Sequence, residues 1–75
     1  MDNFGVVLFH TTSAAFAAEK ALNKAEIDCA LVPVPRQFSS DCGISLRFDW
    51  NREPEVTVLL QTVGVETAAI HRIEQ

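Results

Sequence analysis

The fold is decided by the stretch Ile44-Ser45-Leu46-Arg47-Phe48-Asp49. Large apolar side chains at positions 44, 46 and 48 alternate with polar side chains at 45, 47 and 49. Because successive side chains of a β-strand point to opposite faces of a sheet, this period of two predicts a strand with one buried and one polar face. The remaining elements are expected on either side of this strand.

Upstream, residues 5–10 form a short apolar run, which predicts a central strand covered on both faces. Thr11, Thr12 and Ser13 follow, and each is a favoured N-cap residue. We therefore expect a helix from these residues to about Ala25. Its predicted buried face consists mostly of small side chains: Ala14, Ala15, Ala18, Ala21, Leu22 and Ala25. Phe16 falls on the opposite side.

Residues 27–34 predict a second strand. Pro33 has no amide donor, which suits the end of a strand at a sheet edge. Cys29 lies inside this apolar run, and thiols of this kind are usually buried, so we interpret it as a core residue.

Downstream of the alternating strand, Asn51 is the predicted cap of a second helix, with Pro54 in its first turn. Gly64 is the predicted stop, and residues 65–73 the final strand. The helical spacing i, i+3, i+4, i+7 predicts that one face is buried through Val56, Leu59, Leu60 and Val63.

The predicted order is strand, helix, strand, strand, helix, strand. This is the order of an α+β, ferredoxin-like βαββαβ sandwich, with a four-stranded antiparallel sheet and two helices on one face. Right-handed crossovers place the first and third strands at the centre of the sheet. Residues 1–75 are expected to form a single domain. The alternative is another small α+β sandwich with the same elements.

The second face of such a sheet carries no helix. The apolar side chains of Val6, Val7, Leu8 and Phe9 cannot all face the helices, so some apolar surface is expected on the open face. Patches of this kind usually mark a partner, and a homodimer through the sheet is one hypothesis.

Composition limits the classes of function. Six basic and ten acidic residues give a formal net charge of −4, whereas nucleic-acid binding leaves a basic footprint, so no nucleic-acid partner is expected. No apolar run approaches the roughly 18 residues that span a bilayer, and no signal peptide is recognisable, so no membrane association and a cytoplasmic location are expected. The spacing of the two cysteines fits no common zinc or thioredoxin pattern, and neither metal nor cofactor is expected.

The loop between the second and third strands holds the candidate chemistry. It reads Pro-Val-Pro-Arg-Gln-Phe-Ser-Ser-Asp-Cys-Gly over residues 33–43. Pro35 suits the start of a helical turn and Gly43 the residue after one, so residues 35–42 are predicted to present Cys42.

Charged and polar residues near this thiol decide what it can do. Arg36 and Arg47 are the cations that would raise its thiolate fraction if they lie close by, whereas Asp41 opposes them. Ser39, Ser40 and the amide of Gly43 are candidates to bind an anion such as a persulfide or selenide. The alternative is ordinary turn chemistry with an incidental cysteine.

The sequence resembles a family of small bacterial proteins described as selenium/sulfur carrier-like. The resemblance implies that Cys42 carries persulfide sulfur or selenium, in a setting of Arg36, Ser39, Ser40 and Gly43. The Cys-Pro-x-Pro motif of better-known sulfur carriers is absent. The matching segments are Phe9-His10-Thr11-Thr12, Ala15-x-x-x-Glu19-Lys20, Pro33-Val34-Pro35-Arg36, Ser39-Ser40, Cys42-Gly43 and Leu46-Arg47-Phe48.

The predicted function is that of a non-enzymatic carrier without a cofactor. Cys42 would accept sulfur or selenium from a donor protein such as a cysteine desulfurase and pass it to an acceptor protein. One alternative is a small interaction or regulatory module that uses the open face of the sheet or Phe16. Another is thiol-redox chemistry, which would require Cys29 and Cys42 to lie within about 7 Å, Cα to Cα.

Overall fold

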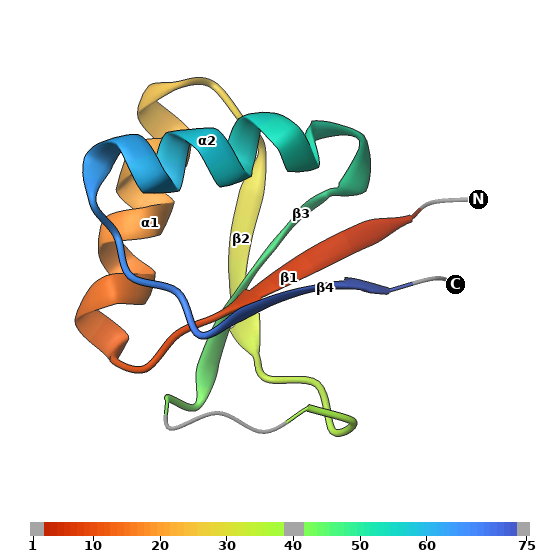
Figure 1. The fold of residues 1–75 in the computed structure, drawn as a ribbon. Coiled ribbons are helices and arrows are strands. Elements are labelled where there is room, and N and C mark those ends of the chain that lie inside the picture. Colours follow the sequence, from red (N-terminus) through yellow and green to blue (C-terminus); the bar gives the residue numbers. More distant parts are fainter. Residues whose placement is uncertain (1–2, 39–41, 74–75) are drawn as a thin grey trace.

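A computed structural model describes residues 3–38 and 42–73 of the chain. Its element order confirms the predicted α+β, ferredoxin-like fold (Figure 1). The elements are β1 (Phe4–Leu8), α1 (Thr12–Lys24), β2 (Cys29–Pro33), β3 (Ile44–Asp49), the short 3-10 helix η1 (Trp50–Arg52), α2 (Glu53–Val63) and β4 (Ala69–Ile73).

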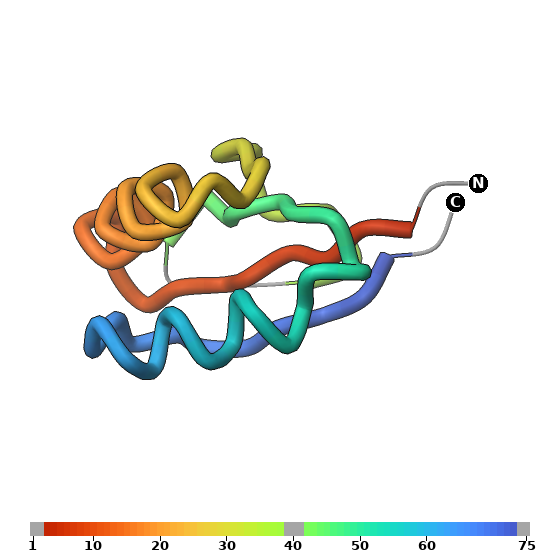
Figure 2. Tube along the Cα trace, turned by 90° about the horizontal axis from the view of Figure 1, so that it is seen from above, coloured from red at the N-terminus to blue at the C-terminus, as the bar shows by residue number. Residues whose placement is uncertain are grey.

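The four strands form one antiparallel sheet in the order β2-β3-β1-β4. The first and third strands are therefore central, as predicted from the crossover rule. Both helices lie on the same side of the sheet, and residues 35–38, which follow β2, lie on the other side (Figure 1). Seen from above, the helices lie side by side, with α2 over β4 (Figure 2), and α1 contacts β2, β3 and α2. Within the described residues, no helix is long and apolar enough to cross a membrane.

The core lies between the helices and the sheet. Val7 and Phe9 extend from β1 into this layer and are fully buried. Ala15 and Ala18 of α1 are equally buried, which agrees with the prediction that small side chains let this helix approach the sheet closely. Val63 was predicted to be buried but is 50% exposed, because α2 ends there. The other core residues are Leu22, Ile27, Leu46, Phe48, Val56 and Leu60.

The residues that begin and end the two helices are those predicted from the sequence, except for the cap of the second helix. Thr11 caps α1, and its side chain accepts a hydrogen bond from the amide of Ala14. The predicted Asn51 cap is wrong: Asp49 accepts from the Asn51 amide at 3.0 Å and so caps η1, which runs into α2. Gly64 ends α2 with φ of 79°, the left-handed conformation that favours glycine.

The second face of the sheet is closed over Val6 and Leu8, which corrects the expectation of exposed apolar surface at these positions. Val6 is 1% exposed and Leu8 3%, although no helix covers them. Ser45, predicted on the polar face of β3, is fully buried and donates a hydrogen bond to the carbonyl of Val32 at 3.2 Å. The apolar surface that motivated a homodimer through the sheet is thus buried within the chain at these positions.

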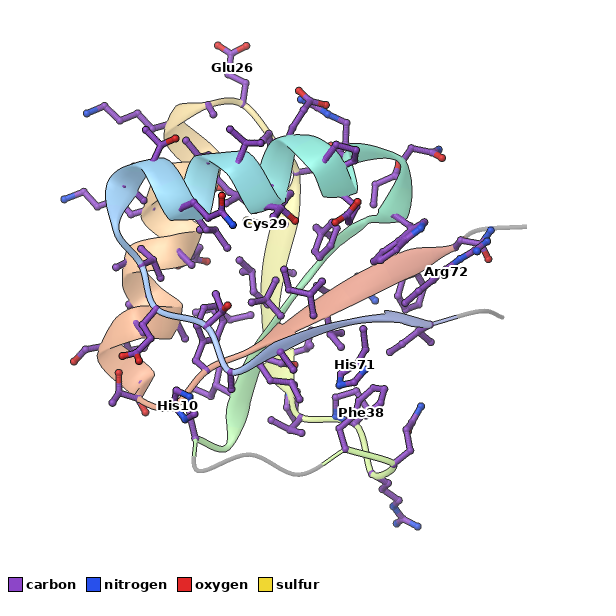
Figure 3. The ribbon with its side chains drawn as sticks, in the orientation of Figure 1. His10, Glu26, Cys29, Phe38, His71 and Arg72 are labelled. Carbon is purple, nitrogen blue, oxygen red and sulfur yellow. The ribbon has the colours of Figure 1, made fainter. Side chains whose placement is uncertain are left out.

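A segment of the loop after β2 packs on this face. Residues 35–38 form a turn in which the amide of Phe38 donates to the carbonyl of Pro35 at 3.0 Å. The ring of Phe38 stacks on His71 of β4, with centroids 4.1 Å apart and planes 9° from parallel (Figure 3). His71 lies opposite Val6 in the sheet, so this stack brings the loop from one edge strand, β2, to the other edge strand beside Val6.

Candidate functional site

The candidate thiol of Cys42 lies beside the first turn of α1. Its Sγ is 3.6 Å from the hydroxyl oxygen of Thr12 and donates to the carbonyl of Ile44 at 3.5 Å. Cys42 is only 4% exposed. The sequence left the exposure of Cys42 open, and the structure describes a side chain that is almost fully buried.

The register of the central strands explains this placement. Leu8 near the end of β1 lies opposite Ser45 near the start of β3. The residues that follow β1 and those that precede β3 are therefore at the same end of the sheet, and α1 begins there at Thr12. Sequence reasoning did not predict Thr12 as a neighbour of Cys42. The antiparallel pairing of the two central strands was the signal that could have found it.

The start of α1 is one part of the surroundings of Cys42. The N-terminus of a helix carries a partial positive charge because its first amides point outward without helical partners. The first turn of α1 contains no acidic residue that would cancel this charge. The Cys42 sulfur thus lies between this helix start and the carbonyl of Ile44, to which it donates.

The predicted supporting residues are only partly brought to Cys42. Gly43 follows the thiol in the chain and is exposed, and its carbonyl accepts from the amide of Val34 at 3.3 Å. Its φ is not positive, so it does not adopt the left-handed conformation in which a glycine commonly ends a helical turn. Arg36 is exposed in the turn after Pro35, and no contact among the described residues joins it to the thiol. Ser39, Ser40 and Asp41 lie outside the described residues.

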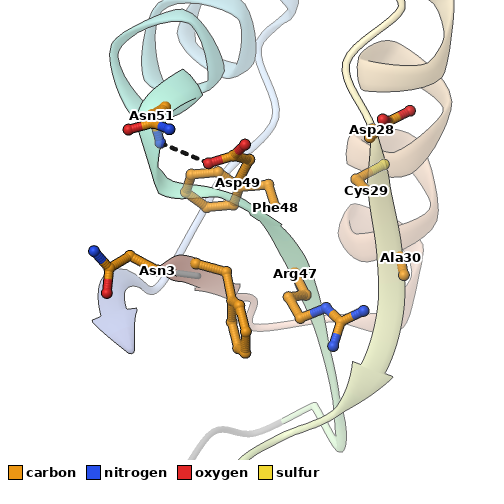
Figure 4. A pocket seen from close by; sticks show the side chains of 9 residues that line it. Asn3, Asp28, Cys29, Ala30, Arg47, Phe48, Asp49 and Asn51 are labelled. Atoms are coloured by element: carbon orange, nitrogen blue, oxygen red, sulfur yellow. Dashed lines mark hydrogen bonds between the residues drawn. The ribbon is translucent and has the colours of Figure 1, made fainter. Parts of the chain in front are cut away.

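Arg47 is not part of the surroundings of Cys42. It lies near the opposite end of β3, where its guanidinium is 5.1 Å from the centre of the Phe4 ring. It lines a separate hollow in the surface together with Asp49 and Asn51 (Figure 4). The expectation that this arginine would raise the thiolate fraction of Cys42 is therefore wrong.

Cys29 occupies the opposite end of α1. It is partly buried against the core, as the sequence predicted, and its Sγ is 3.7 Å from the side-chain oxygen of Asn23 in the last turn of the helix. Burial raises the pKa of the Cys29 thiol, and the nearby carboxylates of Glu19 and Asp28 raise it further. This thiol is held in its neutral form.

The two thiols are too far apart to act as a redox pair. Cys29 lies opposite Phe48, whereas Pro33 lies opposite Ile44, two residues after Cys42. Four residues of β-strand span about 13 Å, so the cysteines are separated by well over the roughly 7 Å that a disulfide allows. The thiol-redox alternative fails on this geometry.

Metal binding finds no support in the part of the chain that the structure describes. Within residues 3–38 and 42–73, no three His, Cys, Asp or Glu side chains are grouped so that they could hold a metal ion. The chemistry available at the candidate site is that of the Cys42 sulfur itself, set between a helix start and a strand start.

The fold and this thiol define a ferredoxin-like α+β protein in which a cysteine from the segment before β3 packs beside the N-terminus of the first helix. Residues 4–72 match the family described as "Putative Se/S carrier protein-like". The chain belongs to this family. Searches of curated proteins and of solved structures gave no match.

Proposed function

We propose that the protein is a carrier of sulfur or selenium and that Cys42 is the carrier thiol. The observation that carries the proposal is the arrangement of the two cysteines at opposite ends of α1. Cys42 contacts Thr12 at the helix N-terminus, and Cys29 contacts Asn23 in the last turn. The family to which the chain belongs supports the class of cargo.

The helix gives the two thiols opposite electrostatic surroundings. A helix dipole favours an anion at the N-terminus and disfavours one at the C-terminus. Carrier chemistry requires a thiolate, because the thiolate and not the thiol is the nucleophile. Cys29 faces the unfavourable end of α1 and two carboxylates, whereas Cys42 faces the favourable end.

The proposed transfer is a thiol exchange that needs no cofactor. The Cys42 thiolate attacks the terminal sulfur of a persulfide on the donor protein. The new Sγ–S bond forms as the donor's S–S bond breaks, and the bonding electron pair leaves with the donor's sulfur as a thiolate. Attack by a thiolate of the acceptor on the carried sulfur reverses these roles, so the two steps together involve no net oxidation. Selenium would be transferred by the same displacement.

Burial of Cys42 gives the carrier a protected resting state. At 4% exposure the sulfur cannot meet a donor's persulfide unless the surrounding chain moves. Thr12 and the start of β3 at Ile44 are among the residues that contact it and would have to move. The proposal therefore includes opening of this end of the sheet when the donor docks.

Mass spectrometry after incubation with a cysteine desulfurase and cysteine tests the proposal. Wild-type protein should gain the mass of one sulfur atom, and reduction by a small thiol should remove it. Cys29→Ser should gain the same mass, whereas Cys42→Ser should gain none. A sulfur adduct that persists in Cys42→Ser, or its absence from the wild-type protein, would refute the proposed role.

The alternative of an interaction module that uses the sheet has lost its main support. That alternative required apolar surface on the second face, where Val6 and Leu8 are buried by the chain itself. Phe16, named in the same alternative, is 52% exposed as predicted. Single exposed apolar side chains are common on protein surfaces and do not mark a partner on their own.

A further inference from the structure

A hollow on the second face of the sheet lies away from Cys42, beside Arg47 (Figure 4). Its volume of about 690 Å³ is within the usual size range of small-molecule sites. The hollow forms partly because Ala30, which lies opposite Arg47 on the edge strand β2, has a small side chain. Its lining residues are Asn3, Phe4, Asp28, Cys29, Ala30, Arg47, Phe48, Asp49 and Asn51.

The guanidinium of Arg47 is unusual in its position. The residue lies on the central strand β3 between Val6 and Ala30, so neither cross-strand neighbour offers a carboxylate. One face of the guanidinium is directed at the ring of Phe4. Among the described residues no ion pair or hydrogen bond engages its N–H groups. Those donors remain available to a ligand, and a guanidinium binds a carboxylate through two parallel hydrogen bonds.

Two carboxylates line the same hollow. Asp28 precedes β2, and Asp49 ends β3 (Figure 4). One carboxylate oxygen of Asp49 accepts a hydrogen bond from the backbone N–H of Asn51, and this bond fixes the Asp49 side chain at the rim of the hollow. Within the described residues neither aspartate pairs with Arg47. The charges of both aspartates also act on the nearby guanidinium of Arg52, which itself pairs with Glu55.

From this separation of charges we propose that the hollow binds a small zwitterion, a ligand that carries both a carboxylate and an ammonium group. The ligand carboxylate binds the guanidinium of Arg47, and the ammonium group lies toward Asp28 and Asp49. Both a free amino acid and the termini of a short peptide have this chemistry. The site is independent of the proposed carrier role, because it lies at the other end of β3 from Cys42.

Ligands with a single charge fit the hollow less well. An anion alone would satisfy Arg47 but would also face the two aspartates across the same cavity, and like charges repel. A cation alone would satisfy the aspartates but would meet the guanidinium. Only a ligand that bridges the two signs gains from both without a repulsive contact.

Titration of the isotope-labelled full chain by NMR tests the site. The probes are L-alanine, L-alanyl-L-alanine, acetate and ethylammonium, each added to about 50 mM, which is well above millimolar affinity. We expect at least one zwitterion to give saturable shifts of the Ala30 and Arg47 amides. Acetate and ethylammonium should bind at least about tenfold more weakly, a difference of about 1.4 kcal/mol. Response to alanine identifies a free amino acid as sufficient, and response to the dipeptide alone identifies a peptide.

Variants make the test specific. Arg47→Gln should weaken zwitterion binding at least about tenfold, whereas Arg36→Gln, which removes an exposed arginine from the turn after Pro35, should leave it unchanged. Because Ala30 lies opposite Arg47 in the hollow, Ala30→Leu should fill the space beside the guanidinium and also weaken zwitterion binding. Equal binding of acetate or ethylammonium, unchanged binding by Arg47→Gln, or no saturable shift with either zwitterion would overturn the proposal.

Discussion

The two ends of α1 give the same side chain two different settings. At the first turn, the Cys42 sulfur meets the hydroxyl of Thr12 at 3.6 Å, and no acidic residue lies in that turn. At the last turn, the Cys29 sulfur meets the Asn23 side chain at 3.7 Å, near Glu19 and Asp28. One helix thus has one thiol beside its start, where the first turn holds no carboxylate, and another beside its end, where two carboxylates raise the thiol pKa. The difference comes from the fold and not from the chemistry of cysteine.

The end of the sheet near Cys29 is packed more tightly than the end near Cys42. Substitution of one glycine at each end is the test with the largest expected effect. A Cβ added at Gly5 would lie 2.6 Å from Trp50 and 2.7 Å from Phe48, the residue opposite Cys29. A Cβ added at Gly43, next to Cys42, would meet nothing within 4 Å. We expect Gly5→Ala to lower the free energy of unfolding by about 2–3 kcal/mol, because two packed rings must shift.

Gly43→Ala is the matched control. It should leave stability unchanged or raise it by up to about 1 kcal/mol, because the unfolded chain loses conformational freedom. Urea denaturation measures both variants. Equal destabilisation by the two substitutions would mean that the end of the sheet near Cys42 is packed as tightly as the end near Cys29.

The fold could be predicted largely from sequence because its signals are local. The alternation of residues 44–49 and the alanine face of α1 are periodic patterns that burial confirms. Ser45 shows where such reasoning stops. Its polar side chain predicted an exposed face, but it is fully buried and donates to the carbonyls of Val32 and Pro33 on the neighbouring strand. A contact between distant segments, such as Phe38 with His71, leaves no periodic signal in either segment.

The sequence predicted which residue is the candidate thiol but not which residues surround it. Cys42 was identified from the loop, whereas Thr12 was missed because it is 30 residues away in the chain. Arg47 was named as a cation that could reach Cys42, although it lies three residues beyond the start of β3 at Ile44, roughly 10 Å further along the sheet. Pairing of β1 with β3 decides which of these residues meets the thiol.

Removing the Phe38 ring should loosen the end of the sheet that holds Cys42. Phe38→Ala breaks the stack on His71 and uncovers part of the second face, and we expect a loss of about 1–2 kcal/mol in the free energy of unfolding. Alkylation of Cys42 should become faster under native conditions, because its loop has lost this anchor, while that of Cys29 should not change. Phe16→Ala removes a ring that is 52% exposed and serves as the control. Equal acceleration at both thiols would indicate general unfolding.

Charge placed at the first turn of α1 should act on Cys42 alone. Thr12→Asp puts a carboxylate where a hydroxyl now lies 3.6 Å from the sulfur, which disfavours the thiolate and should slow sulfur loading about tenfold, or about 1.4 kcal/mol. Ala17→Asp places the same charge on an exposed position of the next turn and should have a smaller effect. Mass spectrometry measures the rate at which each variant and the wild-type protein gain sulfur, and these rates are compared. No slowing by Thr12→Asp would remove α1 from the proposed mechanism.

The smallest expected effect concerns the thiol at the other end of the helix. In a Cys42→Ser background, alkylation of Cys29 followed from about pH 6 to 10 reports one titration. Because its pKa is raised, the thiolate fraction at neutral pH is below that of an ordinary cysteine, and labelling should rise only at higher pH. Glu19→Gln and Asp28→Asn each remove a negative charge that raises this pKa, so each should shift the curve to lower pH. Since burial is the largest cause, neither variant should restore the curve of a free cysteine peptide, and full restoration would show that charge dominates at this end.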